Sequence, residues 1–222
     1  MFIGHYAAGF ALKAVEKKAS LGVLFIAVQF VDILFFSFVP FGIENFNLVE
    51  GYTAVNHMEL YDYPYTHGLL ASFLWAFLIY ALWRFVPFFR QSAPHKVAIV
   101  MALAILSHWF TDLLVHVPDL PLLGNDSLKV GFGLWHNFAA TYALEVALLA
   151  GSIILYLRAT TAKGIMGKYA MIIFGLFLIC IYTLTITMPF DPNLTPTVAG
   201  IMGLILYALF AGIAFWLDRY RT

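Results

Sequence analysis

The chain has 222 residues, of which 63% are hydrophobic and only 11% are charged. Soluble domains carry about 25% charged residues, so this composition excludes an ordinary soluble protein and indicates a polytopic membrane protein. The formal net charge is zero and no basic tail is present, so we expect no nucleic-acid partner. The single cysteine, Cys180, cannot form an internal disulfide.

Apolar runs recur along the whole chain. A spanning helix needs about 20 apolar residues, and the candidate spans are 20–40, 68–88, 97–117, 131–157, 169–188 and 198–217. A shorter helix at 2–18 precedes them; it lacks the basic start and cleavage site of a signal peptide, so we expect it to remain in the mature protein. The sequence therefore predicts an all-α, polytopic transmembrane bundle of six to seven helices. We expect a single membrane domain, 1–222, with a metal site in 1–150 and a two-helix scaffold in 151–222.

Basic residues set the predicted orientation of this bundle. Of the twelve Lys and Arg residues, only Lys129 falls on the opposite side from the rest. The others are Lys13, Lys17, Lys18, Arg84, Arg90, Lys96, Arg158, Lys163, Lys168, Arg219 and Arg221. Because basic residues concentrate in cytoplasmic loops, we expect this side and the C-terminus to be cytoplasmic, as in a prokaryotic cytoplasmic membrane. The loops 41–67, 118–130 and 189–197, which are acidic, would then lie outside.

Histidines cluster toward the predicted outer side, independently of the basic residues. Only His95 falls on the basic side, and the other six are His5, His57, His67, His108, His116 and His136. At 1.5 Å per helical residue, Asp32 and His108 would lie about 12 Å below the outer ends of their helices, Asp112 about 7 Å and His5 about 4–5 Å. His67 would open its helix at the outer surface. Five potential metal ligands, His5, Asp32, His67, His108 and Asp112, thus share one layer.

The segment LSHWFTDLLVH, residues 106–116, carries three of these polar residues on one helical stripe. Residues four apart differ by about 40° and 6 Å, so His108 and Asp112 can bind one ion together. His116 lies about 12 Å from His108 along the axis, so we do not expect both to bind the same ion. His116 would instead contact the substrate, hydrogen-bond to a metal ligand or, if Asp112 bridges two ions, bind the second ion.

Aspartates in this layer need partners that offset the free-energy cost of placing their charge inside the membrane. An ionised aspartate inside a membrane costs about 2.5–3.5 kcal/mol on insertion scales. A His–Asp hydrogen bond that only ties helices together is the alternative, but it needs one pair and not five convergent groups. Imidazole and carboxylate ligands suit zinc, manganese or iron better than magnesium or calcium. We therefore predict one or two divalent transition-metal ions, with zinc as the first choice.

A second polar stripe, Asn137, Thr141 and Glu145, lies on the predicted helix 131–157. Glu145 would lie about 20 Å from the outer end of that helix. We interpret it first as a structural or outer-shell carboxylate, with a base acting through water as the alternative. His136 would lie on the opposite face and cannot pair with it. The candidate catalytic residues are Asp112, His116 and Glu145.

The order of the five predicted ligands resembles the YdjM-like family of membrane-bound, metal-dependent hydrolases, related by ligand pattern to zinc-dependent phospholipase C and zinc single-strand nucleases. The matching stretches are GHYAAGFALKA, FVDILF, YPYTHGLL and LSHWFTDLLVH. The resemblance implies an extracytoplasmic metal site of the phosphoesterase type with Asp112 as the candidate bridge. The chain departs from the family's HRG.THS run, which is YPYTHG here. Ala140 also replaces the Glu of the phospholipases' later His-x-x-x-Glu pair, so a three-metal site is not carried over.

Together these patterns predict a membrane hydrolase in which metal-activated water cleaves a phosphoester of a lipid or lipid-linked substrate. A ceramidase-like membrane amide hydrolase is one alternative; Ser107 is compatible with it, but the C-terminal helix lacks its His pair. A transporter is another, since intramembrane His and Asp often mark ion paths. Neither broken helices nor internal repeats, which transporters commonly show, are evident. A non-catalytic metal-binding subunit is the third.

Overall fold

A computed structural model describes residues 1–87 and 95–222 of the chain. The helices in these residues are α1 (Ile3–Val15), α2 (Leu21–Val28), α3 (Phe30–Phe38), α4 (Leu69–Phe85), α6 (His95–Val115), α7 (Phe138–Ala159), α8 (Gly164–Thr187) and α9 (Pro196–Asp218), with the 3-10 helices η1 (Val39–Phe41) and η2 (Leu134–His136). Two antiparallel pairs complete the fold: β1 (Asn45–Leu48) with β2 (Met58–Asp62), and β3 (Leu120–Pro121) with β4 (Lys129–Val130). The predicted all-α bundle is confirmed. Arg90 and the end of the predicted span 68–88 lie outside the described residues.

Four helices, α6, α7, α8 and α9, are long and apolar enough to cross a membrane. The chain is therefore an integral membrane protein. A fifth candidate span consists of α2 with α3 and η1, which are bent by 52° relative to each other. The predicted span 20–40 is thus retained as a candidate, but it breaks at Gln29, where φ is −101° and ψ is 5°. The expectation that broken helices are absent is wrong for this segment.

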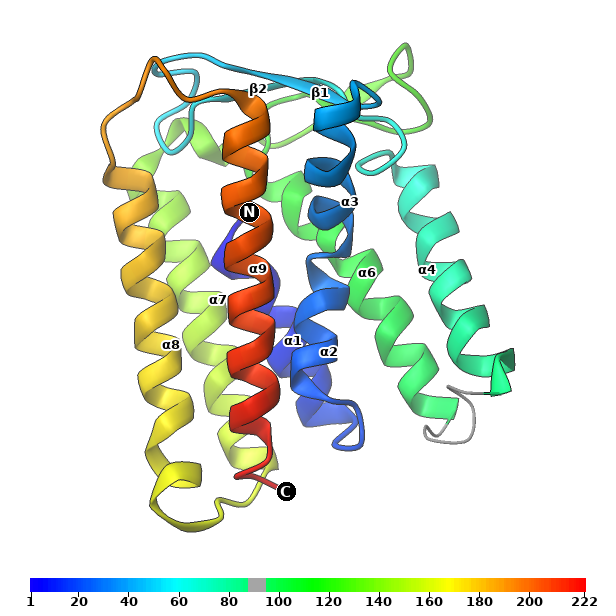
Figure 1. Ribbon diagram of the computed structural model, residues 1–222, viewed down its shortest axis with the longest axis vertical. Helices are drawn as coiled ribbons and strands as arrows, with labels where there is room; N and C mark the ends of the chain where they lie inside the picture. The colour runs from blue at the N-terminus through cyan, green and yellow to red at the C-terminus, as the bar shows by residue number, and fades with distance from the viewer. Residues whose placement is uncertain (88–94) are drawn as a thin grey trace.

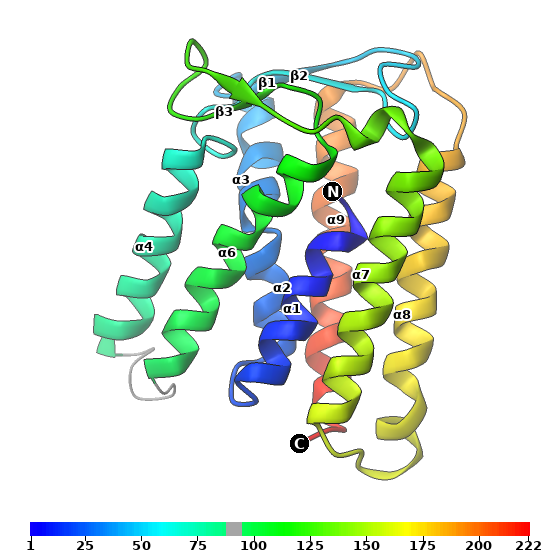
Figure 2. The same cartoon turned by 180° about the vertical axis from the view of Figure 1, so that it is seen from behind.

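Helix α1 lies between α6 and α7 and in front of α2 and α9 in the view of Figure 2. It packs against α7, α2 and α6, and Ile3, Tyr6 and Phe10 are fully buried. The ring of Phe10 meets those of Phe25 and Tyr156 edge-on. Since α1 is only 13 residues long and is covered by longer helices, it carries its histidine, His5, into the interior.

The two ends of the bundle differ in structure. Both sheets lie at one end and the C-terminus lies at the other (Figures 1 and 2). We call residues 42–68 and 116–137, which connect the helices at the sheet end, the sheet-end loops. The Asp62 carboxylate joins them, because it accepts hydrogen bonds from the side-chain amides of Asn45, at 3.0 Å, and of Asn125. Of the described basic residues, Lys129 lies at this end, in β4.

Helix α7 begins at Phe138, and the predicted start at 131 is wrong. The intervening residues close the end of α6 instead: the N–H of Phe132 donates to the Leu113 carbonyl at 2.8 Å, and that of Gly133 to the His116 carbonyl at 2.6 Å. Gly133 has a positive φ of 72°, which favours glycine. Asn137 then caps α7 by accepting the N–H of Ala140 at 3.0 Å.

At the C-terminal end, Lys13 ties α1 to α9. Its Nζ donates to Asp218 Oδ2 and to the carbonyls of Lys17 and Ala19, each at 2.8 Å. Asp218 Oδ2 also accepts the N–H of Leu21 at 3.1 Å. One carboxylate thus holds the turn between α1 and α2 against the last helix.

Asp218→Asn is expected to destabilise the fold, because it leaves the Lys13 ammonium, 9% exposed, without its charged partner. Loss of one member of a buried ion pair costs about 3 kcal/mol, or a fall in melting temperature of roughly 6–12 °C for a chain of this size. Thermal unfolding in detergent, followed by circular dichroism, measures this. Asp191→Asn, in an exposed loop, is the control; an equal melting temperature for both variants would contradict the role of the Lys13–Asp218 pair.

Candidate metal centre

Six side chains that are distant in the sequence converge inside the bundle, toward the sheet end. They are His5 on α1, Asp32 on α3, His67 before α4, His108 and Asp112 on α6, and His116 directly after α6. The shortest approaches join Asp112 to His108, with Nε2–Oδ2 at 3.1 Å, and to His5, with Nε2–Oδ1 at 3.2 Å. His67 Nε2 lies 3.2 Å from Asp32 Oδ1. All five predicted ligands therefore meet, as their common depth predicted.

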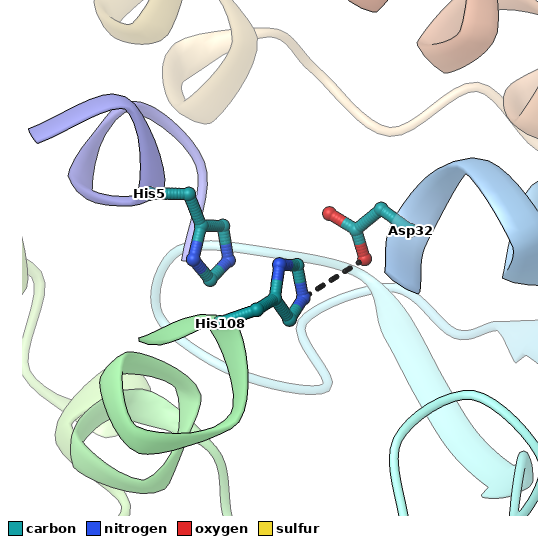
Figure 3. Close-up of side chains that lie close together, drawn as sticks. All are labelled: His5, Asp32 and His108. Carbon is teal, nitrogen blue, oxygen red and sulfur yellow. Dashed lines mark ion pairs between the residues drawn. The ribbon is translucent and has the colours of Figure 1, made fainter. Parts of the chain in front are cut away.

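Two groups of three side chains could each hold a metal ion: His5 with Asp32 and His108, and His67 with His108 and Asp112. Within each group the candidate ligand atoms lie within 4.8 Å of one another. Atoms bound at about 2.0–2.2 Å to one ion lie within such a distance. Figure 3 shows the first group, in which the rings of His5 and His108 stack, with 3.7 Å between their centroids. The two groups share His108.

Two of the histidines are oriented by oxygen atoms that can only accept. His108 Nδ1 lies 2.7 Å from the Val28 carbonyl oxygen, and His116 Nδ1 lies 2.9 Å from Asp119 Oδ1. Both Nδ1 atoms must therefore donate, so the lone pair of each neutral ring is on Nε2. Outer partners of this kind are typical of metal-binding histidines.

His5 is oriented through the hydroxyl of Thr111, which lies 2.9 Å from its Nδ1. Thr111 Oγ1 donates to carbonyl oxygens of its own helix, those of Ser107 at 3.0 Å and His108 at 2.9 Å. When the single hydroxyl proton is donated to either carbonyl, the Thr111 oxygen accepts from His5 Nδ1. Nε2 of His5 then presents its lone pair to Asp112, in the same way as His108 and His116.

His67 follows the same rule through Thr66. Thr66 Oγ1 donates to Glu44 Oε2 at 2.7 Å and accepts from His67 Nδ1 at 2.8 Å. Burial raises the pKa of the Glu44 carboxyl above its usual value, and its hydrogen bonds with Thr66 oppose that shift. Burial and the nearby Asp119 carboxylate likewise raise the pKa of Tyr63, which remains a neutral phenol beside His116.

The centre is consequently a set of converging acceptors. Nε2 atoms of His5 and His108 are buried and have no hydrogen-bond partner among the described residues. Asp32 Oδ2 accepts a hydrogen bond from the Tyr207 hydroxyl at 3.1 Å, and Asp112 Oδ1 accepts one from the N-terminal ammonium group of Met1. Four imidazole lone pairs and two carboxylates still face one another. Protons alone would place several imidazolium charges side by side, whereas a divalent cation held by one of the two groups of three would satisfy the acceptors of that group.

The break between α2 and α3 contributes to this arrangement. In an uninterrupted helix the Val28 carbonyl would accept the N–H of Asp32, four residues on. The 52° bend turns this carbonyl toward α6, where it accepts from His108. Asp32 is in the first turn of α3, where the free N–H groups of the helix favour a carboxylate.

Glu145 lies beside the centre and binds the start of α1. Its Oε2 accepts the N–H groups of Phe2 at 2.9 Å and Gly4 at 3.0 Å, and its Oε1 accepts the Tyr182 hydroxyl at 3.1 Å. Because α7 begins at Phe138, Glu145 lies about 10 Å from the helix start, and the predicted 20 Å is wrong. These contacts match its structural interpretation, and its catalytic role stays a prediction.

The remaining histidines lie outside the centre. His57 Nδ1 accepts the Gly51 N–H at 2.9 Å, within one sheet-end loop. His136 is exposed at the end of η2. His95 is exposed and lies 2.9 Å from the Tyr80 hydroxyl. The clustering of histidines toward the predicted outer side of the membrane therefore did not by itself identify the members of the site.

Sequence reasoning missed the outer partners of the histidines. Thr66 and Thr111 are each adjacent to a predicted ligand, and Asp119 follows His116 by three residues, so proximity was the available signal. Tyr207 comes from the region interpreted as scaffold, and no local pattern distinguishes it from other membrane tyrosines.

Comparison of the chain with protein-family models, with curated proteins and with solved structures finds no match. The resemblance to the YdjM-like hydrolases therefore stays a prediction. What can be said of function depends on the convergence of the histidines and aspartates and on the partners that orient them.

His108→Ala is expected to remove the bound metal, because His108 belongs to both ligand groups. His136→Ala, an exposed histidine outside the centre, is the matched control. Elemental analysis of the purified proteins measures the metal-to-protein ratio. We expect a ratio near one or two for the wild type and the control, and near zero for His108→Ala. Equal metal content in all three would contradict the assignment.

Proposed function

We propose that this protein is a membrane-embedded, metal-dependent hydrolase whose centre holds a divalent transition metal, with zinc as the first choice. The observation that carries the proposal is the convergence of four imidazole Nε2 atoms on the buried carboxylate of Asp112 and the partly buried carboxylate of Asp32, each ring with its Nδ1 directed outward to an oxygen atom. Nitrogen and carboxylate ligands favour zinc, manganese or iron over magnesium and calcium.

In this proposal the ligands are His5, Asp32, His67, His108 and Asp112. The two oxygens of Asp112 face different histidines, Oδ1 toward His5 and Oδ2 toward His108, which supports a bridging position. When bound, a divalent ion acts as a Lewis acid that polarises a phosphoryl oxygen and lowers the pKa of water. The protein's own groups orient the substrate and move protons.

His116 is the proposed general base. Asp119 accepts its Nδ1 proton at 2.9 Å, and its Nε2 lies 3.7 Å from Asp112 Oδ2. A carboxylate on Nδ1 makes Nε2 more basic and stabilises the imidazolium that forms after proton uptake. The ring also lies against Trp135, with 4.1 Å between centroids, which restricts its rotation. His116 would thus take a proton from water and return it to the leaving oxygen.

A lipid or lipid-linked phosphoester is the proposed substrate. An apolar groove of about 430 Å³ runs beside α4 and is lined by Leu69, Leu70, Phe73, Leu122, Leu123 and Leu128. Its first lining residue, Leu69, follows His67 by two residues in the chain, and this nearness in sequence is the basis for placing an acyl chain of the substrate in the groove. The basic residues at the C-terminal end support an extracytoplasmic position for the sheet end and a cytoplasmic C-terminus.

A transporter is the second candidate function, and the broken helix α2–α3 is the observation that favours it. Against it, Gln29 and Tyr6, both fully buried, are the polar groups next to the centre on the side of α1 and α2. Phe10 and Phe25 follow and pack edge-on. On this side of the centre the polar groups are therefore followed by apolar rings. Ser107, which made an amide hydrolase compatible, donates to its own helix at Ala104.

The metal-loaded protein is expected to cleave the phosphoester of phosphatidylglycerol in vesicles and to leave the amide bond of a ceramide substrate intact.

His116→Gln should lower the kcat of phosphoester cleavage by about 10²–10⁴ because the general base is lost, with little loss of bound metal. His57→Gln is the matched control. Preserved kcat in His116→Gln would refute its role as base. Absence of phosphoester cleavage together with metal efflux from loaded vesicles would favour the transporter.

A further inference from the structure

Glu44 is a buried carboxylate in a sheet-end loop whose neighbouring residues are exposed. It is fully buried, whereas Gly42 and Ile43 before it are exposed. Its Oε1 accepts the N–H groups of Tyr65 at 2.7 Å and Thr66 at 3.0 Å, and its Oε2 accepts the Thr66 hydroxyl at 2.7 Å. Three donors from one short segment therefore converge on this carboxylate, and that segment ends at His67.

These hydrogen bonds have a defined direction. Glu44 receives the only hydroxyl proton of Thr66, so Thr66 Oγ1 can interact with His67 Nδ1, 2.8 Å away, only as an acceptor. The proton of neutral His67 is then on Nδ1 and the lone pair is on Nε2. Nε2 lies 3.2 Å from Asp32 Oδ1 and 3.9 Å from Asp112 Oδ2.

The opposite tautomer would have a different consequence. With its proton on Nε2, His67 would donate to Asp32 Oδ1 and occupy one of the candidate metal ligands with a hydrogen bond. Asp32 is near enough to accept it. The Thr66 hydroxyl therefore decides between a ring that can bind a metal ion and a ring that pairs with Asp32 instead.

We propose that Glu44 and Thr66 are positioning residues of the metal centre, which hold His67 as the Nδ1–H tautomer and keep its Nε2 available as a ligand. This inference rests on the proposed metal site. The other three histidines obtain the same tautomer from the Val28 carbonyl, from Asp119 and from Thr111. His67 alone among them depends on a carboxylate that acts through a hydroxyl.

The test compares two substitutions of one residue. Thr66→Val removes the hydroxyl with little change in shape, and Thr66→Ser keeps it. Zinc affinity of the purified full chain, measured by competition with a chromophoric chelator, is expected to fall about 10–100-fold in Thr66→Val and to stay near the wild-type value in Thr66→Ser. Thr53→Val, a buried threonine of the same loop, is the control and should bind zinc as the wild type does.

A second readout does not depend on the metal. In metal-free wild type labelled with ¹⁵N-histidine, His67, assigned by its loss in His67→Gln, should show the nitrogen shifts of the Nδ1–H tautomer, and Thr66→Val should shift it toward Nε2–H. Equal zinc affinity of Thr66→Val and Thr66→Ser, or an Nε2–H ring in the wild type, would overturn the inference. If the wild type binds no zinc, the proposed metal site fails, and the tautomer of His67 still tests the roles of Glu44 and Thr66.

Discussion

The burial of the Asp112 carboxylate is the constraint on which the rest of the structure depends. It lies in the last turn of α6, a helix long and apolar enough to span a membrane, and is 1% exposed, and a charge without partners is costly inside a membrane. His108 and His116 lie on its own helical face, and His5 and His67 reach it from α1 and from a sheet-end loop. The position of α1 and the fold of that loop each bring one histidine to the Asp112 carboxylate.

The four histidine rings of the centre share one orientation, with Nδ1 outward and Nε2 inward. Outside it, oxygen atoms lie at hydrogen-bond distance from the Nδ1 atoms, and inside it the Nε2 atoms face two carboxylates, which also accept from the Met1 ammonium and the Tyr207 hydroxyl. The partners differ in kind: a carbonyl released by a helix break, a carboxylate, and two hydroxyls whose protons are used elsewhere. Different local structures with the same outcome are what a metal site requires of its ligands.

The helices and the five candidate ligands could be predicted because each is marked by the hydropathy of the residues immediately around it. A charged or imidazole side chain is conspicuous within an apolar run, and hydropathy alone marks the runs. The bend at Gln29 could not be predicted, since neither Pro nor Gly stands there. The start of α7 was misplaced because residues 131–137, which are mostly apolar, close the end of α6 and form the short 3-10 helix η2 instead of a first turn of α7.

Contacts between distant segments were the other limit. Glu44 and Thr66 are 22 residues apart and Tyr207 is 175 residues from Asp32, and nothing in either local sequence indicates that they meet. His116 was predicted to lie beyond the reach of the ion held by His108, and it belongs to neither group of three that could hold a metal ion. Its N–H still donates to the Asp112 carbonyl at 2.9 Å, as in a regular helix.

X-ray absorption at the metal edge of the purified, zinc-loaded protein tests the central claim most directly, because it reports the atoms bound to the ion. The structure predicts nitrogen and oxygen neighbours at about 2.0–2.1 Å, with the outer-shell scattering of several imidazole rings. This scattering should be lost when Asp112 is replaced by Asn. A spectrum without imidazole features, or one unchanged by that substitution, would contradict a metal centre at Asp112.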